Sequence, residues 1–497
     1  MLGQPHLWRS GGSVGVLTQA PAKAPPEVVC VDLDGTLIKT DTLWESLLLL
    51  AKSRPWELFL VVLWLYRGKA HLKRRLAARV VPDPALLPYR SQVLDSLLEL
   101  KDDGKKLVLA TAADERIARA VARHLGLFDD VIASDGKTNC AGTNKLLAIE
   151  RRLGRAPFAY WGDSHADLPL WQAAAKAYVV GSGRRVSIAA QAVCTPHAVF
   201  VTQRGRASAL AAALRPHQWV KNLLVLLPLF LSHEWNQLAK LALALLGLAA
   251  FSAAASAIYV VNDLLDIEAD RRHPSKRRRP FAAGDLSVPA GLLLSGSAGV
   301  AAFVLAFGCV SPQFTCWLAV YLALTTAYSL FLKKQLLLDV ILLAGLYTLR
   351  IVAGAAAIDV PLSPWLLAFA MFFFLSLALG KRYIELRRVA DRPGAVLPGR
   401  GYCADDAQLL ESIGPTSGYL AVLVLCLYID SSAVGALYRS PWVLWLICPV
   451  LLYWITRFWL LARRKQVSDD PVVFALKDKA SIGMIGLTAA LVLLAAA

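Results

Sequence analysis

The chain has 497 residues, of which 57% are hydrophobic and only 18% are charged. In an ordinary soluble domain roughly 45–50% of residues are apolar, so this composition excludes a single soluble globule. The 53 lysines and arginines outnumber the 36 acidic residues and give a net charge of +17. Because many of these cations lie in short loops between apolar segments, the charge favours membrane orientation and anionic ligands, and no nucleic-acid partner is expected.

The distribution of charge divides the chain into two parts. Charged residues are dense over 1–205, and beyond them apolar segments of about 20 residues, the length that spans a bilayer, alternate with short charged loops. We predict a disordered lead over 1–26, an enzyme domain over 27–205 and an all-α membrane domain over 206–497. The lead has no continuous apolar core of signal-peptide length, so the enzyme domain is expected to stay in the cytoplasm.

Apolar strands alternate with helices in the enzyme domain. The segments 28–35, 105–125 and 158–174 each read as a strand that runs into polar residues or a helix. This alternation predicts an α/β, Rossmann-like parallel sheet whose ligands bind at the carboxyl ends of the strands. Residues 41–100 have a helical pattern and are expected to form a cap over the active site. A cap that also touches the membrane surface is the alternative.

Four polar elements follow one another along this domain: Asp32-Leu-Asp34-Gly-Thr, Thr111, Lys145 and Gly-Asp163-Ser-His-Ala-Asp167. Two carboxylates two residues apart at a strand end can divide the work of phosphoryl transfer, one attacking phosphorus and the other protonating the leaving oxygen. A hydroxyl and a lysine suit the phosphoryl oxygens, and a further carboxylate completes a magnesium site. The set therefore indicates phosphoryl transfer.

In this order the four elements resemble those of the haloacid dehalogenase-like (HAD) phosphatases, over nearly the whole domain. The resemblance implies that Asp32 is the nucleophile and Asp34 the general acid and base. It also implies that Thr111 and Lys145 bind the phosphate. The magnesium ligands that it implies are Asp32, Asp34 and Asp163, with Asp167 supporting the site. A degenerate, merely structural copy is the alternative, although no motif residue is missing.

The second part of the chain contains nine apolar segments that we predict to span the membrane: 219–236, 238–261, 288–308, 311–332, 335–358, 362–380, 413–430, 440–462 and 480–496. If residues 1–218 are cytoplasmic, the connections on that side are rich in lysine and arginine, whereas the opposite loops hold only Lys240 and Arg439. The positive-inside rule then predicts a multi-pass protein of the cell (inner) membrane, with the enzyme domain and both active sites on the cytoplasmic side.

An acidic motif stands at the end of the second apolar segment and consists of Asn262, Asp263, Asp266 and Asp270. This spacing places all four on one face of a helix. Carboxylates at the end of a membrane helix are costly unless they are paired or bind metal, and Mg²⁺ bridging them to a diphosphate is the use that the chemistry favours. An acidic helix end balanced by the arginines that follow is the alternative.

The acidic motif and the stretch 273–284 that follows it resemble the UbiA family of membrane-embedded transferases, over roughly residues 210–497. This family normally has a second aspartate-rich motif, but here residues 328–339 hold a single aspartate and two lysines. That departure puts ordinary aromatic prenylation in doubt. Further strings resemble the decaprenyl-phosphate phosphoribosyltransferase branch of the family; they lie at 215–222, 350–354, 380–385 and 470–475.

This branch is understood to displace pyrophosphate from phosphoribosyl pyrophosphate with a polyprenyl phosphate. The resemblance implies a Mg²⁺ site at the acidic motif, with Asp266 and Asp270 catalytic. The substrate-binding residues that we predict are Lys221, Arg272, Lys276, Arg279, Tyr328, Lys333, Asp339, Arg350 and Lys381. For Arg350 and Lys221 the alternative is snorkelling to the membrane interface, and for the basic loop 276–279 it is a signal for topology alone.

Together the two resemblances imply that the membrane domain makes a 5-phosphoribosyl lipid and that the HAD domain removes its 5-phosphate. The product would be polyprenylphosphoryl ribose, a pentose donor for cell-envelope glycan. Two rivals stay open: an aromatic prenyltransferase that uses polyprenyl diphosphate, and a phosphatase whose helices only tether it to the bilayer.

Overall fold

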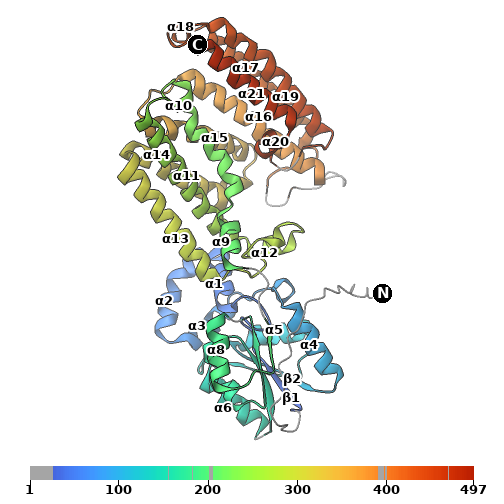
Figure 1. Ribbon diagram of the computed structural model, residues 1–497. Coiled ribbons are helices and arrows are strands. Elements are labelled where there is room, and N and C mark those ends of the chain that lie inside the picture. The colour runs from blue at the N-terminus through green and yellow to red at the C-terminus, as the bar shows by residue number, and fades with distance from the viewer. Residues whose placement is uncertain are drawn as a thin grey trace. The chain divides into compact units, whose positions relative to one another are not determined.

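The computed structural model describes residues 26–154, 156–181, 183–200, 205–389, 397, 400–467 and 470–496. The lead predicted over 1–26 lies outside these residues except for its last position. The described chain divides into two compact units (Figure 1). The first holds the residues up to Ala213 together with Val260–Leu293, and the second holds Leu214–Tyr259 together with the residues from Leu294 onward.

The first unit is built on a six-stranded parallel sheet in the order β3-β2-β1-β4-β5-β6. The strands are β1 (Val28–Val31), β2 (Lys106–Asp114), β3 (Asp130–Ser134), β4 (Phe158–Gly162), β5 (Lys176–Val180) and β6 (Ala198–Phe200). The chain adds β2 and β3 on one side of β1 and the last three strands on the other. The carboxyl ends of β1 and β4 therefore flank the crevice where doubly wound sheets bind ligands, as the sequence predicts.

Helices cover both faces of this sheet, so the strands carry apolar side chains on both sides. Val29 and Val31 point into one core cluster, and Cys30 points into the other. Besides α12 (Ile267–Arg272), the helices of this unit are α1 (Thr42–Ser53), α2 (Leu58–Tyr66), α3 (Lys69–Ala77), α4 (Ser91–Asp102), α5 (Glu115–Leu125), α6 (Thr143–Leu153), α7 (Leu168–Ala173) and α8 (Arg184–Val193). A further helix, α9 (Arg206–Leu214), ends at the boundary of the unit.

The segment between β1 and β2 is helical, as its pattern predicts. Helix α1 begins after Asp41, whose carboxylate accepts hydrogen bonds from the backbone N–H groups of Leu43 and Trp44 and so caps the helix. The helices α1, α2 and α3 pack around a small apolar cluster that contains Trp64 and Leu76. This cluster makes the three helices a cap with its own core.

The second unit is helical throughout its described residues. Its helices, including two that it shares with the first unit (α11 and α13), are α10 (Leu227–Leu231), α11 (Leu238–Leu265), α13 (Val288–Leu305), α14 (Pro312–Leu330), α15 (Leu338–Ile358), α16 (Pro364–Val389), α17 (Asp406–Ile429), α18 (Ser432–Leu437), α19 (Ile447–Arg463), α20 (Pro471–Lys477) and α21 (Lys479–Ala496). Seven helices of the described chain are long and apolar enough to cross a membrane, namely those that contain α11, α13, α15, α16, α17, α19 and α21. The chain is therefore a multi-pass membrane protein.

Nine spans are not confirmed. The predicted span over 219–236 forms a 3-10 stretch, Pro216–Leu226, followed by the five-residue helix α10. The predicted span over 311–332 forms α14, which has 19 residues but includes several threonines and other polar residues that lower its mean hydropathy. Apolar content alone did not reveal these differences, because both segments are nearly free of charge.

Candidate active sites

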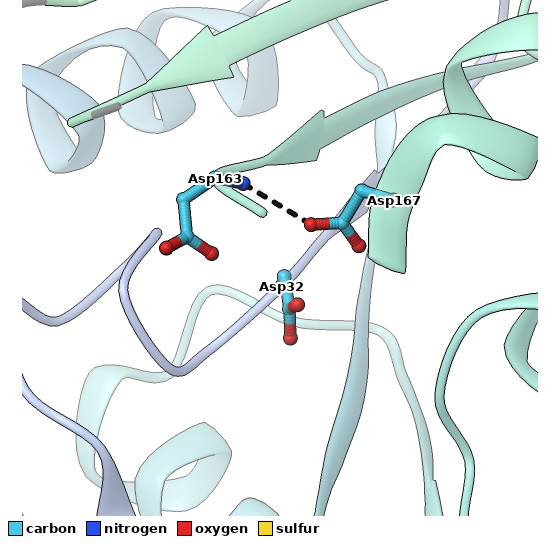
Figure 2. Close-up of side chains that lie close together, drawn as sticks. All are labelled: Asp32, Asp163 and Asp167. Atoms are coloured by element: carbon cyan, nitrogen blue, oxygen red, sulfur yellow. Dashed lines mark hydrogen bonds between the residues drawn. The ribbon is translucent and has the colours of Figure 1, made fainter. Parts of the chain in front are cut away.

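The first candidate site lies where β1 and β4 end. Asp32 directly follows β1, and its backbone N–H donates to the carbonyl of Trp161 on β4 at 3.0 Å. Asp163 directly follows β4, and its N–H donates to Oδ2 of Asp167 at 3.2 Å (Figure 2). Ligand oxygens of Asp32, Asp163 and Asp167 all lie within 4.8 Å of one another. The structure thus brings together three of the predicted carboxylates.

Lys145 on α6 completes this site from the side. Its Nζ lies 2.6 Å from Oδ2 of Asp32 and 3.6 Å from Oδ1 of Asp167, and it donates to the hydroxyl of Tyr160 at 3.0 Å. Burial raises the pKa of Asp32, and the ammonium of Lys145 opposes that rise. Burial alone would lower the pKa of Lys145, but the two carboxylates raise it. A buried, charged lysine therefore stands beside the predicted nucleophile, where phosphoryl oxygens need a cation.

Asp34 occupies a different environment from Asp32. Its carboxylate accepts hydrogen bonds from the N–H of Thr42 at 2.8 Å and from the hydroxyl of the same residue at 3.2 Å. Burial and the neighbouring Asp41 raise the pKa of Asp34 well above its usual range. A raised pKa favours the protonated form of this carboxyl group, which is the form that a general acid needs. Its carboxylate is not part of the three-carboxylate group, so its role as a metal ligand stays a prediction.

The three-carboxylate group has the donor chemistry that Mg²⁺ prefers. Both oxygens of Asp167 already accept hydrogen bonds, from Tyr160 and from Asp163 and Ser164, so this residue orients the others. Burial, followed by the charges of Asp32 and Asp167, raises the pKa of Asp163 to about 8. The mutual repulsion of these carboxylates fits a divalent cation bound among them.

Gly35 allows the carboxylate of Asp163 to lie close to the loop after β1, as the three-carboxylate group requires. Its φ is +76°, and a Cβ at this position would lie 2.1 Å from Oδ2 of Asp163. The residue must therefore be glycine for two reasons, the left-handed backbone and the lack of space. Thr36, the next residue, donates to Oδ1 of Asp163 at 3.3 Å. Thr111 lies within β2, fully buried, and its Oγ1 accepts the N–H of Ala113 at 3.0 Å.

Three residues of this site were missed by the sequence analysis: Tyr160, Lys73 and Arg90. Tyr160 bridges Lys145 and Asp167. Lys73 on the cap helix α3 donates to the carbonyl of Ala112 at 2.7 Å and lines a cavity with Thr42; burial lowers its pKa, although the aspartates around it oppose that shift. Arg90 donates to the carbonyl of Gly35 at 3.2 Å. Lys73 stands in a basic run, and no sequence signal distinguishes it from its exposed neighbours.

The second candidate site is the acidic motif, which does not form the single unbroken helix that its spacing predicts. Helix α11 ends at Leu265 and α12 begins at Ile267, so Asp266 lies at a break, with φ −102° and ψ 14°. No glycine or proline marks this break in the sequence. The backbone turn continues across it, because the N–H of Asp266 donates to the carbonyl of Asn262 at 2.9 Å.

Asp263 and Asp270 nevertheless come together across the break. Nη1 of Arg279 donates to Oδ1 of Asp263 at 3.1 Å and to Oδ2 of Asp270 at 2.7 Å. Both aspartates are buried. Asp266 instead pairs with Lys52 of α1, at 3.0 Å. One guanidinium nitrogen shared by two buried carboxylates marks a place built for positive charge, which fits a divalent cation as well.

The basic residues after the motif take different positions. Arg272 and Lys276 are exposed, and Arg272 lies 3.5 Å from Asp83. Arg271, which the sequence analysis did not select, forms a buried two-pronged ion pair with Glu45 at 2.7 and 2.8 Å. This pair ties α12 to α1 within the same unit.

In the second unit, Arg350 and Lys221 are buried, so the snorkelling alternative is wrong for both. Arg350 donates to Oδ1 of Asn222 at 3.0 Å and to the hydroxyl of Tyr321 at 3.2 Å. Lys221 pairs with Asp470 at 2.5 Å, and Lys381 lies 3.8 Å from the same carboxylate. Asp470 gathers two of the predicted lysines and was itself not selected.

A second polar cluster of this unit surrounds Asp339, which is fully buried. Its Oδ2 accepts from Nε of Arg382 at 2.5 Å, and its Oδ1 accepts from the hydroxyl of Tyr402 at 2.6 Å. The hydroxyl of Tyr328 accepts from Arg382 at 2.9 Å and from Arg400 at 2.7 Å. The backbone carbonyl of Lys333 accepts a hydrogen bond from Arg400 at 3.4 Å. Tyr328, Lys333 and Asp339 were selected from the sequence, whereas Arg382 and Arg400, which join them, were not.

The two parts of the chain match two families. A sequence profile of the haloacid dehalogenase-like hydrolases matches residues 29–172, and one of the UbiA prenyltransferase family matches residues 223–480. The second match covers more than half of the chain. The protein therefore belongs to the UbiA prenyltransferase family, and it carries a HAD-like hydrolase domain before its membrane helices.

Individual relatives cover different parts of the chain. It is 38% identical to the uncharacterized protein y4nM of Sinorhizobium fredii, over 91% of this chain and 88% of that one. It is 41% identical to the decaprenyl-phosphate phosphoribosyltransferase of Mycolicibacterium smegmatis, over 38% of this chain and 60% of that protein. A solved UbiA homolog from Archaeoglobus fulgidus bound to GPP and Mg²⁺ is 16% identical with a TM-score of 0.44, over 57% of this chain and 99% of that one.

Proposed function

We propose that the chain catalyses two consecutive reactions on a polyprenyl phosphate. In the first, the lipid phosphate displaces diphosphate from C1 of phosphoribosyl pyrophosphate, and in the second, water removes the 5-phosphate of the bound ribose. The product is polyprenylphosphoryl ribose, a pentose donor for cell-envelope glycan. The observation that carries this proposal is the Asp32–Lys145–Asp163 constellation, in a chain that is 41% identical, over 38% of its length, to a decaprenyl-phosphate phosphoribosyltransferase.

In the hydrolytic step Asp32 attacks phosphorus and Asp34 gives its proton to the departing ribose oxygen. Lys145 binds the phosphoryl oxygens, and Thr111 presents its hydroxyl to the same group. Asp34 then accepts a proton from water, which cleaves the phosphoryl-aspartate and releases inorganic phosphate. The raised pKa of Asp34 supports this assignment, and the hydrogen bonds from Thr42 hold its carboxyl group in place.

In the transfer step the acidic motif serves the diphosphate. Asp263, Asp266 and Asp270 would hold Mg²⁺, helped by Asn262, and Mg²⁺ supplies charge neutralisation of the leaving group when bound. Seven cationic side chains are proposed to bind the substrates: Lys221, Arg272, Lys276, Arg279, Lys333, Arg350 and Lys381. Tyr328 and Asp339 would position Arg382 within the second unit, as their hydrogen bonds to this arginine suggest.

We also propose that both reactions take place on the cytoplasmic side of the inner membrane. The lysine- and arginine-rich loops support this orientation through the positive-inside rule. The ion pair between Glu45 and Arg271 supports a common side for the hydrolase and the acidic motif. The lipid product would then need no passage across the bilayer between the two steps.

The decisive variants are Asp270→Asn and Asp266→Asn, measured in purified full-length protein in detergent. With Mg²⁺, polyprenyl phosphate and phosphoribosyl pyrophosphate labelled in the ribose, the unaltered protein should make lipid-soluble radioactivity and each variant should lose it. Hydrolysis of a small phosphomonoester should persist in both, because the change removes one carboxylate of the other site. Glu268→Gln on the same short helix is the matched control and should retain both activities.

Transfer at the unaltered rate in both aspartate variants would remove the acidic motif from the mechanism. Incorporation of a prenyl group into an aromatic acid, without any ribosyl transfer, would favour the rival aromatic prenyltransferase. No lipid-linked product from either donor, with phosphomonoester hydrolysis intact, would leave a tethered phosphatase.

A further inference from the structure

The segment Pro55–Tyr66 of the cap carries an apolar surface that the fold leaves uncovered. It comprises a 3-10 turn, Pro55–Glu57, and the nine-residue helix α2 (Figure 1). Phe59 is 67% exposed, Val62 is 71% exposed and Tyr66 is 94% exposed. Leu58, Leu63 and Leu65 are exposed as well. Soluble surfaces rarely leave so many neighbouring large apolar side chains in water, and such a patch marks a binding surface.

This surface is held rigidly by the rest of the cap. Trp64 is the one buried residue of α2, and it lies in the cluster of Leu50, Leu72 and Leu76. The guanidinium carbon of Arg79 stands 4.4 Å from the centre of the Trp64 ring. Arg79 also pairs with Glu57 at the start of the segment. One side of the helix is therefore anchored to the cap, and the remaining sides stay free for a partner.

The chemistry of the patch fits the surface of a phospholipid bilayer. Twelve residues are too few to span the hydrocarbon core, which takes about 20 residues, but they suit a helix that lies in the interface. Trp56 and Tyr66 stand at its two ends, and these side chains favour the boundary between headgroups and acyl chains. The exposed cations Arg67 and Lys69 directly follow it and suit anionic headgroups.

A bilayer is close to this segment because the same chain is a membrane protein, with seven helices among its described residues that are long and apolar enough to cross a membrane. Glu57, the single acidic residue of the segment, is neutralised by Arg54 and Arg79, so no unpaired negative charge on it opposes anionic lipid. We propose that Pro55–Tyr66 is an interfacial membrane-binding element of the cap, with its apolar side chains among the lipid headgroups and upper acyl chains.

The consequence for catalysis rests on the proposed function. Helix α2 packs against α3 in the same apolar cluster, and α3 supplies Lys73 to the cavity beside the phosphatase site. A cap held at the interface would keep the entrance of this site near a phosphate that is attached to a lipid. Docking should therefore matter for a lipid substrate and not for a soluble one.

The test uses the full-length protein in vesicles that contain phosphatidylglycerol with radiolabelled acyl chains. A photoreactive benzoylphenylalanine replaces Phe59 in one variant and Ile188 in the other. Ile188 on α8 is a matched control, because it is also an exposed apolar side chain of the first unit, at 56%. We expect a lipid adduct in the variant with the photoreactive residue at position 59 and no lipid adduct in the variant that carries it at position 188. Equal labelling at both positions, or an adduct at 59 with protein instead of lipid, would overturn the proposal.

A second experiment tests the role of the basic residues beside the segment. Replacing Arg67 and Lys69 by glutamine should weaken docking on anionic vesicles by up to about thirtyfold, since each basic residue near the surface contributes about 1 kcal/mol. It should change nothing on zwitterionic vesicles. An adduct yield at position 59 that does not depend on these cations in anionic vesicles would contradict the assigned headgroup chemistry.

The catalytic consequence is tested separately with the double variant Phe59→Glu, Val62→Glu. Hydrolysis of a soluble phosphomonoester should be unchanged, and hydrolysis of the ribosyl lipid in vesicles should fall. If the lipid adduct forms but neither protein hydrolyses the ribosyl lipid, the proposed function fails and the membrane element stands. If the unaltered protein hydrolyses the lipid without any adduct at position 59, the membrane element fails and the proposed function stands.

Discussion

At the scale of single residues, the phosphatase site depends on how closely Asp163 can approach the loop after β1. Gly35→Ala would place a methyl group 2.1 Å from the Asp163 carboxylate and add strain at a φ of +76°. We expect the Mg²⁺ concentration needed for half-maximal phosphomonoester hydrolysis to rise at least about tenfold, because displacing one of few carboxylate ligands costs more than 1.4 kcal/mol.

Gly104→Ala is the matched control for this prediction. Gly104 has nearly the same φ, +78°, but has no atom within 4 Å of the added Cβ. The backbone strain of about 1–2 kcal/mol is therefore shared by both variants, while the clash is not. If Gly104→Ala shifts the Mg²⁺ dependence as far as Gly35→Ala does, general destabilisation is the cause and the approach to Asp163 is not.

Whether the sequence could reveal a site residue depends on how that residue comes to lie beside its partners. Asp32 and Asp163 directly follow strands, so the strand pattern predicts that they meet, and their carboxylates do lie together with that of Asp167, whereas Asp34 lies outside this group. Tyr160 and Lys73 contact the site only through the packing of β4 and α3, which no local pattern encodes. Arg382 likewise meets Asp339 across 43 residues, a pairing set by helix packing in the second unit.

At the scale of elements, the break between α11 and α12 changes the meaning of the acidic motif. Asp266, at the break, pairs with Lys52, whereas Asp263 and Asp270 both pair with Arg279. Helix periodicity could not predict the break, because the spacing of the motif is compatible with an unbroken helix. The same limit applies to 219–236, where an apolar run forms two short elements instead of a span.

Arg279→Gln tests this arrangement. The guanidinium competes with Mg²⁺ for two carboxylates, so its removal should lower the Mg²⁺ concentration needed for half-maximal ribosyl transfer. The maximal rate should fall, because the same cation is proposed to bind a substrate phosphate, and a hydrogen bond to a charged group is worth about 1.5–3 kcal/mol. Arg277→Gln, in the same loop and exposed, should leave both quantities unchanged. A higher Mg²⁺ requirement in Arg279→Gln would show that the arginine assists the metal instead of competing with it.

At the scale of the whole molecule, one chain holds a HAD-like hydrolase domain and a UbiA-type transferase domain, and we propose that they catalyse consecutive steps. The proposed order follows from the chemistry, because phosphoribosyl pyrophosphate would bring the 5-phosphate that the hydrolase is proposed to remove. The full-length similarity to a second protein of the same arrangement, 38% identical over 91% of this chain, indicates that the joined architecture is not peculiar to this chain.

The most direct measurement is the chemical form of the lipid product made by Asp32→Asn. Purified full-length protein receives Mg²⁺, polyprenyl phosphate and labelled phosphoribosyl pyrophosphate, and the lipid extract is analysed by mass spectrometry. The unaltered protein should yield polyprenylphosphoryl ribose, whereas Asp32→Asn should accumulate the 5-phosphorylated lipid at an undiminished rate of transfer, because the variant lacks only the nucleophile of the second step. Dephosphorylated lipid from Asp32→Asn in the same amount as from the unaltered protein would contradict the account.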